Sequence, residues 1–304
     1  MEGYDTGNDT RVKRDTMSQS PILVTGATGR VGRLVVDELL RAGAPVRALT
    51  RRPDSASLPA AVDVVAGDLT DPSSLDAALD GAETVFLVWT AAAATLPAVV
   101  ARIAERPRRV VYLGSPHQTP HPFFQQPNPL RGLHAEIERR LAESGLDVAV
   151  LRPGMFASNT RHWWAPQISR GDVVRWPYGA VETAPIDERD IAAVAARVLL
   201  DTKYANADCV LTGAESLSHV EQVHAIGDAI GRSLTFEELS PDEFRSETAS
   251  TWPPMVVEML LSAWQATLGH RAYVTSSVEE ITGSPARTFH QWAIDNAAAF
   301  ARST

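Results

Sequence analysis

Three glycines near the N-terminus have the spacing of a phosphate-binding turn. Residues 25–32 read TGATGRVG, which contains the pattern G-x-x-G-x-x-G between an apolar run and a helical pattern. In such a turn the first glycine allows a sharp bend, the second lets a pyrophosphate approach the backbone, and the third lets the helix pack closely on the strand. The helix N-terminus then offers unpaired N–H groups to the phosphates. We expect a dinucleotide to bind here, against the alternative of a tight turn without a ligand.

The residues after the second apolar run indicate which dinucleotide this is. Sites for NAD carry an acidic residue at this point for the ribose hydroxyls, whereas this chain has Thr50, Arg51 and Arg52. A guanidinium group suits the 2′-phosphate of NADP. We therefore predict NADP(H), with Arg51 and, as a second candidate, Arg30 as the phosphate partners. The alternative is a pair of solvated surface arginines.

Segments after the next predicted strands complete the expected cofactor site. Ligands bind outside the carboxyl ends of parallel strands, so Asp68 is expected beside the adenine amino group and residues 88–90 are expected to border the cofactor. The predicted cofactor contacts are Gly26, Ala27, Thr28, Gly29, Arg30, Val31, Gly32, Arg51, Asp68, Leu69, Val88, Trp89, Thr90 and Gly114.

Composition excludes several other chemistries. Only Lys13 and Lys203 among the 28 basic residues are lysines, so a Schiff-base lysine or a Walker-type phosphate loop has almost no candidates. The single cysteine, Cys209, excludes an intramolecular disulfide framework and a Cys-rich zinc site. No metal site is expected, and His219 and His224 are predicted to be surface residues of a helix. A formal net charge of -9 gives no general reason to expect nucleic-acid binding.

The elements that must position these residues alternate between strand and helix. Strands are predicted at 22–25, 46–49, 62–66, 84–88, 110–113 and 147–151. Helices are predicted at 33–40, from Asp71-Pro72 onward, at 95–105 and at 133–143. This alternation indicates an α/β fold with a doubly wound parallel sheet of strand order 3-2-1-4-5-6.

The second half of the chain has a different pattern. Residues 153–186 are rich in Pro, Gly and aromatic side chains and are predicted to form loops around a site. Asp187 is predicted to cap a helix that runs to Leu200. A strand at 209–211, a helix at 218–230, a strand at 234–238 and helical patterns at 241–267 and 287–302 follow. We divide the chain into a tail (1–20), a dinucleotide-binding domain (21–152) and a smaller α/β substrate region (153–304) interleaved with it.

Several segments together resemble the NmrA-like group of atypical short-chain dehydrogenases. They are TGATGRVG, LTRR at 49–52, AGDL at 66–69, VVYLGS at 110–115, SGLDVAVLRPGMFASN at 144–159 and PIDERDIAAVAARVLL at 185–200. The resemblance covers residues 21–302 and implies an NAD(P)-binding Rossmann domain with a small C-terminal substrate region. It also implies relatives among NADPH-dependent quinone reductases, ergot-alkaloid-type reductases and regulators that bind the dinucleotide without turnover.

The expected catalytic residues depart from the usual pattern of that group. Short-chain dehydrogenases generally use Tyr-x-x-x-Lys, and no tyrosine here has a lysine four residues later. Ser115 stands near the place of the family's serine, and His134 occupies the helical position where related reductases carry Tyr or Lys. Glu138 lies one turn further on. An imidazole with a pKa near ~6.5 can donate a proton at neutral pH. We take these three as catalytic candidates, with a purely positional His134 as the alternative.

Aromatic side chains are expected to form the substrate site. Phe156, Trp163, Trp164 and Trp176 fall in the segment predicted to lack regular structure, and Phe123 and Phe124 fall in the Pro-rich segment 116–129, predicted to be a lid. Either they line the acceptor pocket, or the tryptophans pack as a satellite core. A pocket of this kind favours a flat, apolar or aromatic acceptor.

These observations predict an NADPH-dependent oxidoreductase that transfers a hydride to a small acceptor such as a quinone, enone or imine. A non-catalytic NADP(H) sensor and a non-redox isomerase or cyclase stay open as alternatives. No nucleic-acid partner is expected, because the net charge is negative. No membrane partner is expected either, because no apolar run approaches the ~20 residues that span a bilayer. Residues 1–20 lack the apolar core of a signal peptide, so a cytoplasmic protein is expected, either monomer or homodimer.

Overall fold

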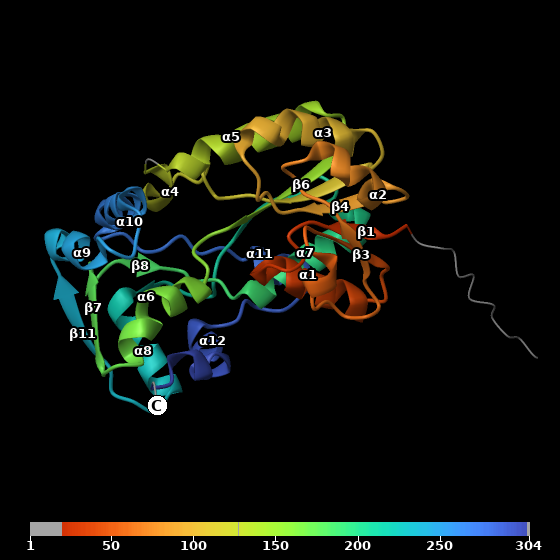
Figure 1. Cartoon of the computed structure of the whole chain (residues 1–304). Coiled ribbons are helices and arrows are strands. Elements are labelled where there is room, and N and C mark those ends of the chain that lie inside the picture. The colour runs from red at the N-terminus through yellow and green to blue at the C-terminus, as the bar shows by residue number, and fades with distance from the viewer. Residues whose placement is uncertain (1–19, 127, 303–304) are drawn as a thin grey trace, which may run out of the picture.

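A parallel sheet stands at the centre of the computed structural model, which describes residues 20–126 and 128–302 (Figure 1). In this part of the chain the sheet has seven strands in the order β3-β2-β1-β4-β5-β6-β9. They are β1 (Ile22–Val24), β2 (Val46–Thr50), β3 (Asp63–Ala66), β4 (Thr84–Leu87), β5 (Arg109–Leu113), β6 (Asp147–Pro153) and β9 (Asp208–Leu211). The predicted order of the first six strands is confirmed, and β9, predicted as a strand without a place in the sheet, pairs with β6. Residues 1–19 of the predicted tail lie outside the described residues.

Alternating side chains of the strands fill two separate cores, one on each face of the sheet. In β4, Val85 and Leu87 belong to the core under α2 (Asp76–Leu79), α3 (Leu96–Ala104) and α5 (Pro129–Glu143), whereas Phe86 belongs to the opposite one. That opposite core lies under α1 (Arg30–Arg41), α7 (Glu188–Leu200) and α11 (Ser277–Thr282). Figure 1 shows the two sets of helices above and below the strands. The apolar runs in the sequence are therefore strands whose two faces are both buried.

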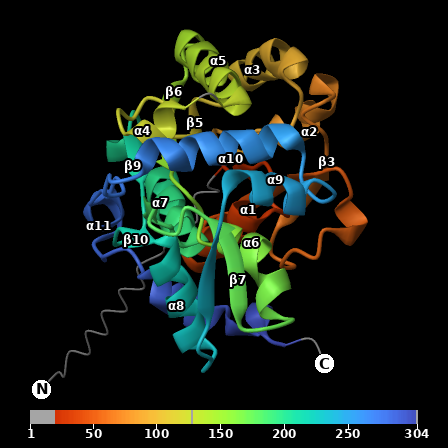
Figure 2. The same cartoon turned by 90° about the vertical axis from the view of Figure 1, so that its left-hand side faces the viewer.

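A third core lies in the C-terminal half of the chain, at the left of Figure 1 and facing the viewer in Figure 2. Here β7 (Val173–Pro177) pairs in parallel with β11 (Thr235–Leu239), and β8 (Glu182–Thr183) pairs antiparallel with β10 (Leu217–Ser218). The helices around them are α6 (Ser158–Ile168), α8 (His219–Ala229), α9 (Pro241–Thr248), α10 (Pro254–Thr267) and α12 (Phe289–Asp295).

The prediction that residues 153–186 form loops is wrong for three elements, α6, β7 and β8. Trp164 and Ile168 stand one helical turn apart in α6, and both are fully buried in the third core. Pro166 lies inside this helix, and the bulky tryptophans have low helical propensity. Burial of the apolar side chains outweighs those local preferences, which is a tertiary effect that a sequence pattern does not contain.

Short elements complete the described chain. They are the helix α4 (Pro122–Gln125) and the 3₁₀ turns η1 (Pro53–Ser55), η2 (Pro72–Leu75), η3 (Ala93–Thr95), η4 (Thr202–Tyr204) and η5 (Ala297–Phe300). The predicted cap of α7 is confirmed, because the Asp187 side chain accepts a hydrogen bond from the N–H of Arg189. Among the described helices, none combines the length and the apolar character needed to cross a membrane.

Candidate active site

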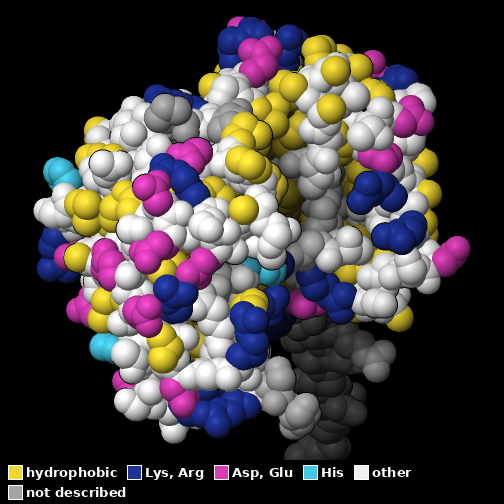
Figure 3. Space-filling model, turned by 60° about the vertical axis from the view of Figure 1, so that its left-hand side comes forward, with side chains coloured by type: hydrophobic (Ala, Val, Ile, Leu, Met, Phe, Trp, Pro, Cys, Tyr) yellow, Lys and Arg dark blue, Asp and Glu magenta, His cyan; other side chains and the backbone are white. Residues whose placement is uncertain are grey.

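The carboxyl ends of β1, β2 and β3 open onto one hollow of the surface. Its lining includes seven of the predicted cofactor contacts, Gly26, Thr28, Gly29, Arg51, Asp68, Leu69 and Thr90, together with Thr25, Leu49, Thr50, Arg52 and Gly67. Figure 3 shows a deep cleft between the two masses of the molecule, with apolar side chains in its upper part and basic side chains gathered near its lower end. Together with Thr90 after β4, the ends of four strands thus bring together segments that lie up to 65 residues apart in the sequence.

The glycine-rich turn has the geometry that a bound pyrophosphate needs. Gly26 has a φ of +64°, which side chains disfavour, and its carbonyl accepts a hydrogen bond of 2.9 Å from the N–H of Gly29. A Cβ on Gly32 would lie 2.2 Å from the Gly26 oxygen, so helix and turn can approach this closely only with glycine. Gly29 is the N-cap of α1 and provides no side-chain cap. The first N–H groups of α1 therefore lack a capping side chain, which fits a phosphate ligand.

Two predicted contacts in this turn can offer only their backbone to a ligand. The side chains of Ala27 and Val31 are buried in the core beneath α1.

The end of β4 is tied to the end of β1. Val88 is held at the turn by Thr25, whose hydroxyl accepts a hydrogen bond of 2.7 Å from the Val88 N–H. Trp89 is half-buried against the core beneath α3 and α5. The ends of β1 and β4 are thereby fixed beside each other, where the order of the strands reverses.

Arg51 and Arg52 are exposed at the edge of this hollow. Within the described chain neither guanidinium group makes a hydrogen bond or an ion pair, so both are available to a phosphate. Arg30 is placed differently. Its guanidinium reaches helix α6, where it donates a hydrogen bond of 2.9 Å to the Ser158 hydroxyl and contacts His162. The residue predicted as a second phosphate partner therefore bridges the glycine turn and the C-terminal half.

A charged cluster lies behind Ser115. Arg152 is 4% exposed and donates hydrogen bonds to Glu138, to Asp208 and to the backbone carbonyl of Ser115. Nε2 of His117 lies 3.6 Å from Glu138, and its Nδ1 lies 3.3 Å from the Ser115 hydroxyl. Both oxygens of Glu138 are therefore engaged. Arg152 and Asp208 are not among the residues predicted for the site, and His117 lies in the segment predicted to be a lid. Arg152 nevertheless directly follows the sixth apolar run, much as Ser115 follows the fifth.

The neighbour of Glu138 on helix α5 has a different environment. Nδ1 of His134 lies 2.6 Å from the hydroxyl of Tyr112, which is fully buried in β5. Burial, with the nearby His117 and Arg152 adding to it, lowers the pKa of His134 to about 4. The expectation of an imidazole that titrates near neutral pH is thus revised: His134 is neutral at pH 7. Gly114 packs between these residues, because a Cβ there would lie 3.2 Å from Glu138 and from the Tyr112 ring.

The predicted substrate residues separate into two groups. Trp164 and Trp176 are buried in the third core, which is the satellite-core alternative. Trp163 is half-buried and stacks on Trp176 with ring centroids 5.6 Å apart. Phe156 is half-buried against the core of the main sheet and forms a bridge with Ile186.

His219 contradicts its prediction as a surface residue, whereas His224 is exposed as predicted. His219 is fully buried, and its ring packs edge-on to Trp264 with centroids 5.2 Å apart. Burial lowers its pKa to about 4. It is the first residue of α8, directly after the N-cap Ser218, and its Nδ1 lies 3.4 Å from the carbonyl of Pro177.

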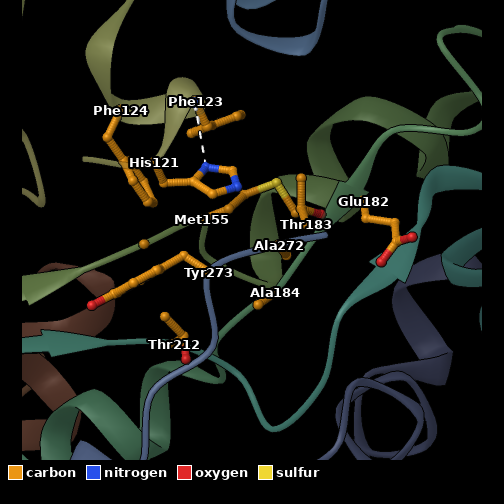
Figure 4. A pocket seen from close by; sticks show the side chains of 11 residues that line it. His121, Phe123, Phe124, Met155, Glu182, Thr183, Ala184, Thr212, Ala272 and Tyr273 are labelled. Carbon is orange, nitrogen blue, oxygen red and sulfur yellow. Dashed lines mark hydrogen bonds between the residues drawn. The ribbon is translucent and has the colours of Figure 1, made fainter. Parts of the chain in front are cut away.

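A second hollow lies at the carboxyl ends of β6 and β9 (Figure 4). Three aromatic rings stand together on one side of it, with the His121 ring 6.0 Å from that of Phe124 and 6.5 Å from that of Tyr273. Nε2 of His121 bonds the Arg271 carbonyl at 2.9 Å, which ties the predicted lid to the loop that carries Tyr273. The other lining residues are Phe123, Gly154, Met155, Glu182, Thr183, Ala184, Thr212 and Ala272. Sequence reasoning found Phe123 and Phe124 but missed Tyr273 and Thr212; Thr212 follows β9 by the same rule that located Asp68.

Comparison with known proteins places the chain among reductases. The model of the NmrA-like family matches residues 18–292. A (4-alkanoyl-5-oxo-2,5-dihydrofuran-3-yl)methyl phosphate reductase of Streptomyces griseus is 37% identical over 294 residues, which cover 92% of this chain and 99% of that protein. An NAD(P)H azoreductase of Xenophilus azovorans is 30% identical, with 92% and 99% covered. The structure of the NADPH-dependent quinone oxidoreductase QOR2 from Escherichia coli, complexed with NADPH, superposes with a TM-score of 0.77 at 23% identity and covers 90% of this chain and 98% of that one.

Proposed function

The chain belongs to the NmrA-like family, and from that premise we propose that it is an NADPH-dependent oxidoreductase that reduces a flat, apolar or aromatic acceptor. The chain is an NAD(P)H-dependent oxidoreductase, related over nearly its whole length to proteins that are named reductases. The observation that carries the choice of NADP(H) is the pair Arg51 and Arg52 at the end of β2, exposed beside the glycine-rich turn.

The residues present fit the dinucleotide. The uncapped start of α1 and the turn from Gly26 to Gly29 would hold the pyrophosphate, and Arg51 would bind the 2′-phosphate. Asp68 is half-buried at the end of β3; one of its oxygens accepts a hydrogen bond from Thr70, and we propose that the other faces the adenine. When bound, the reduced nicotinamide supplies a hydride.

The aromatic hollow at the ends of β6 and β9 is the proposed acceptor site. A dinucleotide that starts at β1, β2 and β3 extends across the sheet toward β4 and β5. Beyond β5 lie the aromatic hollow and a hollow lined by Ser115 and His117, and the two share Phe123 and Phe124. Phe123, Phe124 and Tyr273 offer flat apolar surfaces to an acceptor, whereas the hydroxyls of Thr183 and Thr212 are already hydrogen-bonded within the protein. These surfaces favour a quinone, an enone or an imine.

The three catalytic candidates take different roles in this proposal. His134, neutral at pH 7, donates a hydrogen bond from its ring to the acceptor as negative charge develops on it. Ser115 lies at the end of β5 and orients the acceptor through its hydroxyl. Glu138 has both oxygens engaged by Arg152, so it holds the cluster in place and does not transfer the proton.

A cofactor-binding measurement followed by a turnover screen tests the proposal. Purified protein is titrated with NADPH and NADH, and loss of NADPH absorbance is then followed with quinones, enones and imines, and with hydroxy acids and sugar nucleotides as the comparison set. We expect turnover with the flat apolar set. Tight NADPH binding without turnover of any compound in the panel would contradict the proposed reductase activity and favour a sensor. Conversion of a substrate without net loss of NADPH would favour an isomerase.

A further inference from the structure

Tyr112 carries no role so far, although it contacts a proposed catalytic side chain. Its ring is fully buried in β5, two residues before Gly114, and its hydroxyl lies 2.6 Å from Nδ1 of His134. Within the described chain this is the hydroxyl's one hydrogen bond. His134 stands in the second turn of α5 and makes no hydrogen bond through Nε2 to another described residue.

The direction of the hydrogen bond follows from the chemistry of the two groups. Burial, reinforced by the nearby Glu138, raises the pKa of Tyr112 well above its usual range, so the phenol keeps its proton. A buried hydroxyl donates that proton where an acceptor is available, and the acceptor here is Nδ1. A neutral imidazole that accepts at Nδ1 carries its own proton on Nε2.

We propose that Tyr112 is a positioning residue that fixes His134 as the Nε2–H tautomer, so that His134 presents a hydrogen-bond donor to the acceptor. The inference rests on the proposed function for the identity of the reaction, while the tautomer itself is a property of the protein alone. A donor held in place before the reaction stabilises the developing charge without having to reorganise.

The proton that completes the reduction need not come from His134, which can donate a hydrogen bond and keep its own proton. The acceptor carbon gains a hydride, the electron pair of its double bond to oxygen or nitrogen moves onto that atom, and one proton is then added there. Water supplies this proton. A neutral imidazole would become an imidazolate by giving it up, and transfer from Tyr112 through His134 would leave a phenolate in a buried site.

The charged groups around Tyr112 and His134 also favour a neutral His134. The nearby Arg152 guanidinium disfavours a positive charge on His134, and Glu138 is already occupied by Arg152. The Glu138 carboxylate is therefore not free to accept a proton from the imidazole. Tyr112 is left as the group that selects the tautomer.

Nitrogen-15 NMR of the histidine rings tests the tautomer without cofactor or acceptor. The His134 signals are assigned by their loss in His134→Phe. We expect wild type to show a protonated Nε2 and an unprotonated Nδ1, and Tyr112→Phe to show a mixture of tautomers. Tyr204→Phe is the matched control, because it removes a hydroxyl that bonds Ile281 far from α5, and it should leave the His134 signals unchanged. A protonated Nδ1 in wild type, or an unchanged tautomer in Tyr112→Phe, would overturn the proposal.

A double-mutant cycle tests the consequence for turnover. We expect Tyr112→Phe to lower kcat about tenfold with KM for NADPH unchanged, and to have no further effect in the His134→Phe background. Equal losses in both backgrounds would show that Tyr112 acts by another route. If no acceptor is reduced by wild type, the proposed function fails while the NMR result still decides the tautomer.

Discussion

Arg152 of β6 holds Glu138 of α5 through two hydrogen bonds of 2.8 and 3.0 Å, and both side chains are nearly buried. The same guanidinium bonds Asp208 of β9 and the carbonyl of Ser115. One side chain therefore joins a helix, two strands and the loop that carries a proposed catalytic serine.

Removal of this guanidinium should destabilise the protein strongly. Arg152→Met leaves the Glu138 carboxylate without its partner, and breaking a buried pair in this way costs about 3 kcal/mol or more of unfolding free energy. Chemical denaturation measures the loss. Arg106→Met, which breaks an exposed pair with Asp80, is the control and should change stability little. Similar losses in the two variants would contradict a special role for Arg152.

Cofactor preference should depend on Arg51. We expect NADPH to bind at least tenfold tighter than NADH, which is about 1.4 kcal/mol, because only NADPH offers a 2′-phosphate to the guanidinium group. Arg51→Ala should reduce that difference and leave NADH affinity nearly unchanged. Calorimetry at a fixed, moderate ionic strength checks this, since low salt exaggerates exposed charges. Equal affinities in wild type would remove the basis for assigning Arg51 to the phosphate.

The glycine turn offers a comparison between two glycines in helices. Gly32→Ala places a Cβ 2.2 Å from the Gly26 oxygen, so the turn must open and NADPH affinity should fall by tenfold or more. Gly132→Ala in α5 meets no atom within 4 Å and should leave binding unchanged. That control should also stabilise the helix by roughly 0.5–1 kcal/mol. Unchanged NADPH binding in Gly32→Ala would show that the turn does not hold the cofactor.

His219 should contribute to a rise of stability with pH through the acid range. Its pKa is lowered to about 4 in the folded protein, below the value of about 6.5 expected when unfolded, so the unfolded state binds more protons between these values. His219 therefore destabilises the fold as the pH falls from about 6.5 toward 4. His219→Phe should make the stability profile less steep in this window, with the remaining slope coming from His134, whose pKa is lowered to about 4 as well, whereas His224→Phe, exposed on the same helix, should leave the slope unchanged. The measurement is denaturation at a series of pH values, and a profile unaffected by His219→Phe would refute the assignment.

The two aromatic groups should respond differently to truncation. Trp164→Ala empties a site in the third core and should lower unfolding free energy by about 3–5 kcal/mol. Tyr273→Ala removes a wall of the proposed acceptor site and should raise KM for the acceptor severalfold, with KM for NADPH and thermal stability nearly unchanged. Steady-state kinetics beside thermal unfolding separates the two effects. A Tyr273→Ala effect on stability alone would argue against the acceptor site.

The sheet could be predicted from the sequence because its apolar runs are short and separated by turn residues, and because the first run is followed by glycines with a fixed spacing. The glycine turn, Arg51 and Asp68 were predicted for the same reason, since each follows a strand. From the sequence, a separate core of tryptophans was only one of two alternatives, because Trp164 and Trp176 join it through contacts with α8, α10 and β11 that lie far away in the sequence. Tyr112 was missed because its buried strand position resembles that of any core residue.

The order in which the chain visits its sheet limits how this protein can be divided. After β6 the chain builds α6, β7 and β8, returns to the main sheet with α7 and β9, and leaves again for β10. A fragment that ended at residue 152 would lack β9 and α7, and the apolar face that α7 covers, including Phe86 and Val111, would meet water. The two halves are thus unsuited to exchange as modules between relatives. New acceptor preferences are better sought by grafting single loops, such as the segment around Tyr273, onto an intact chain.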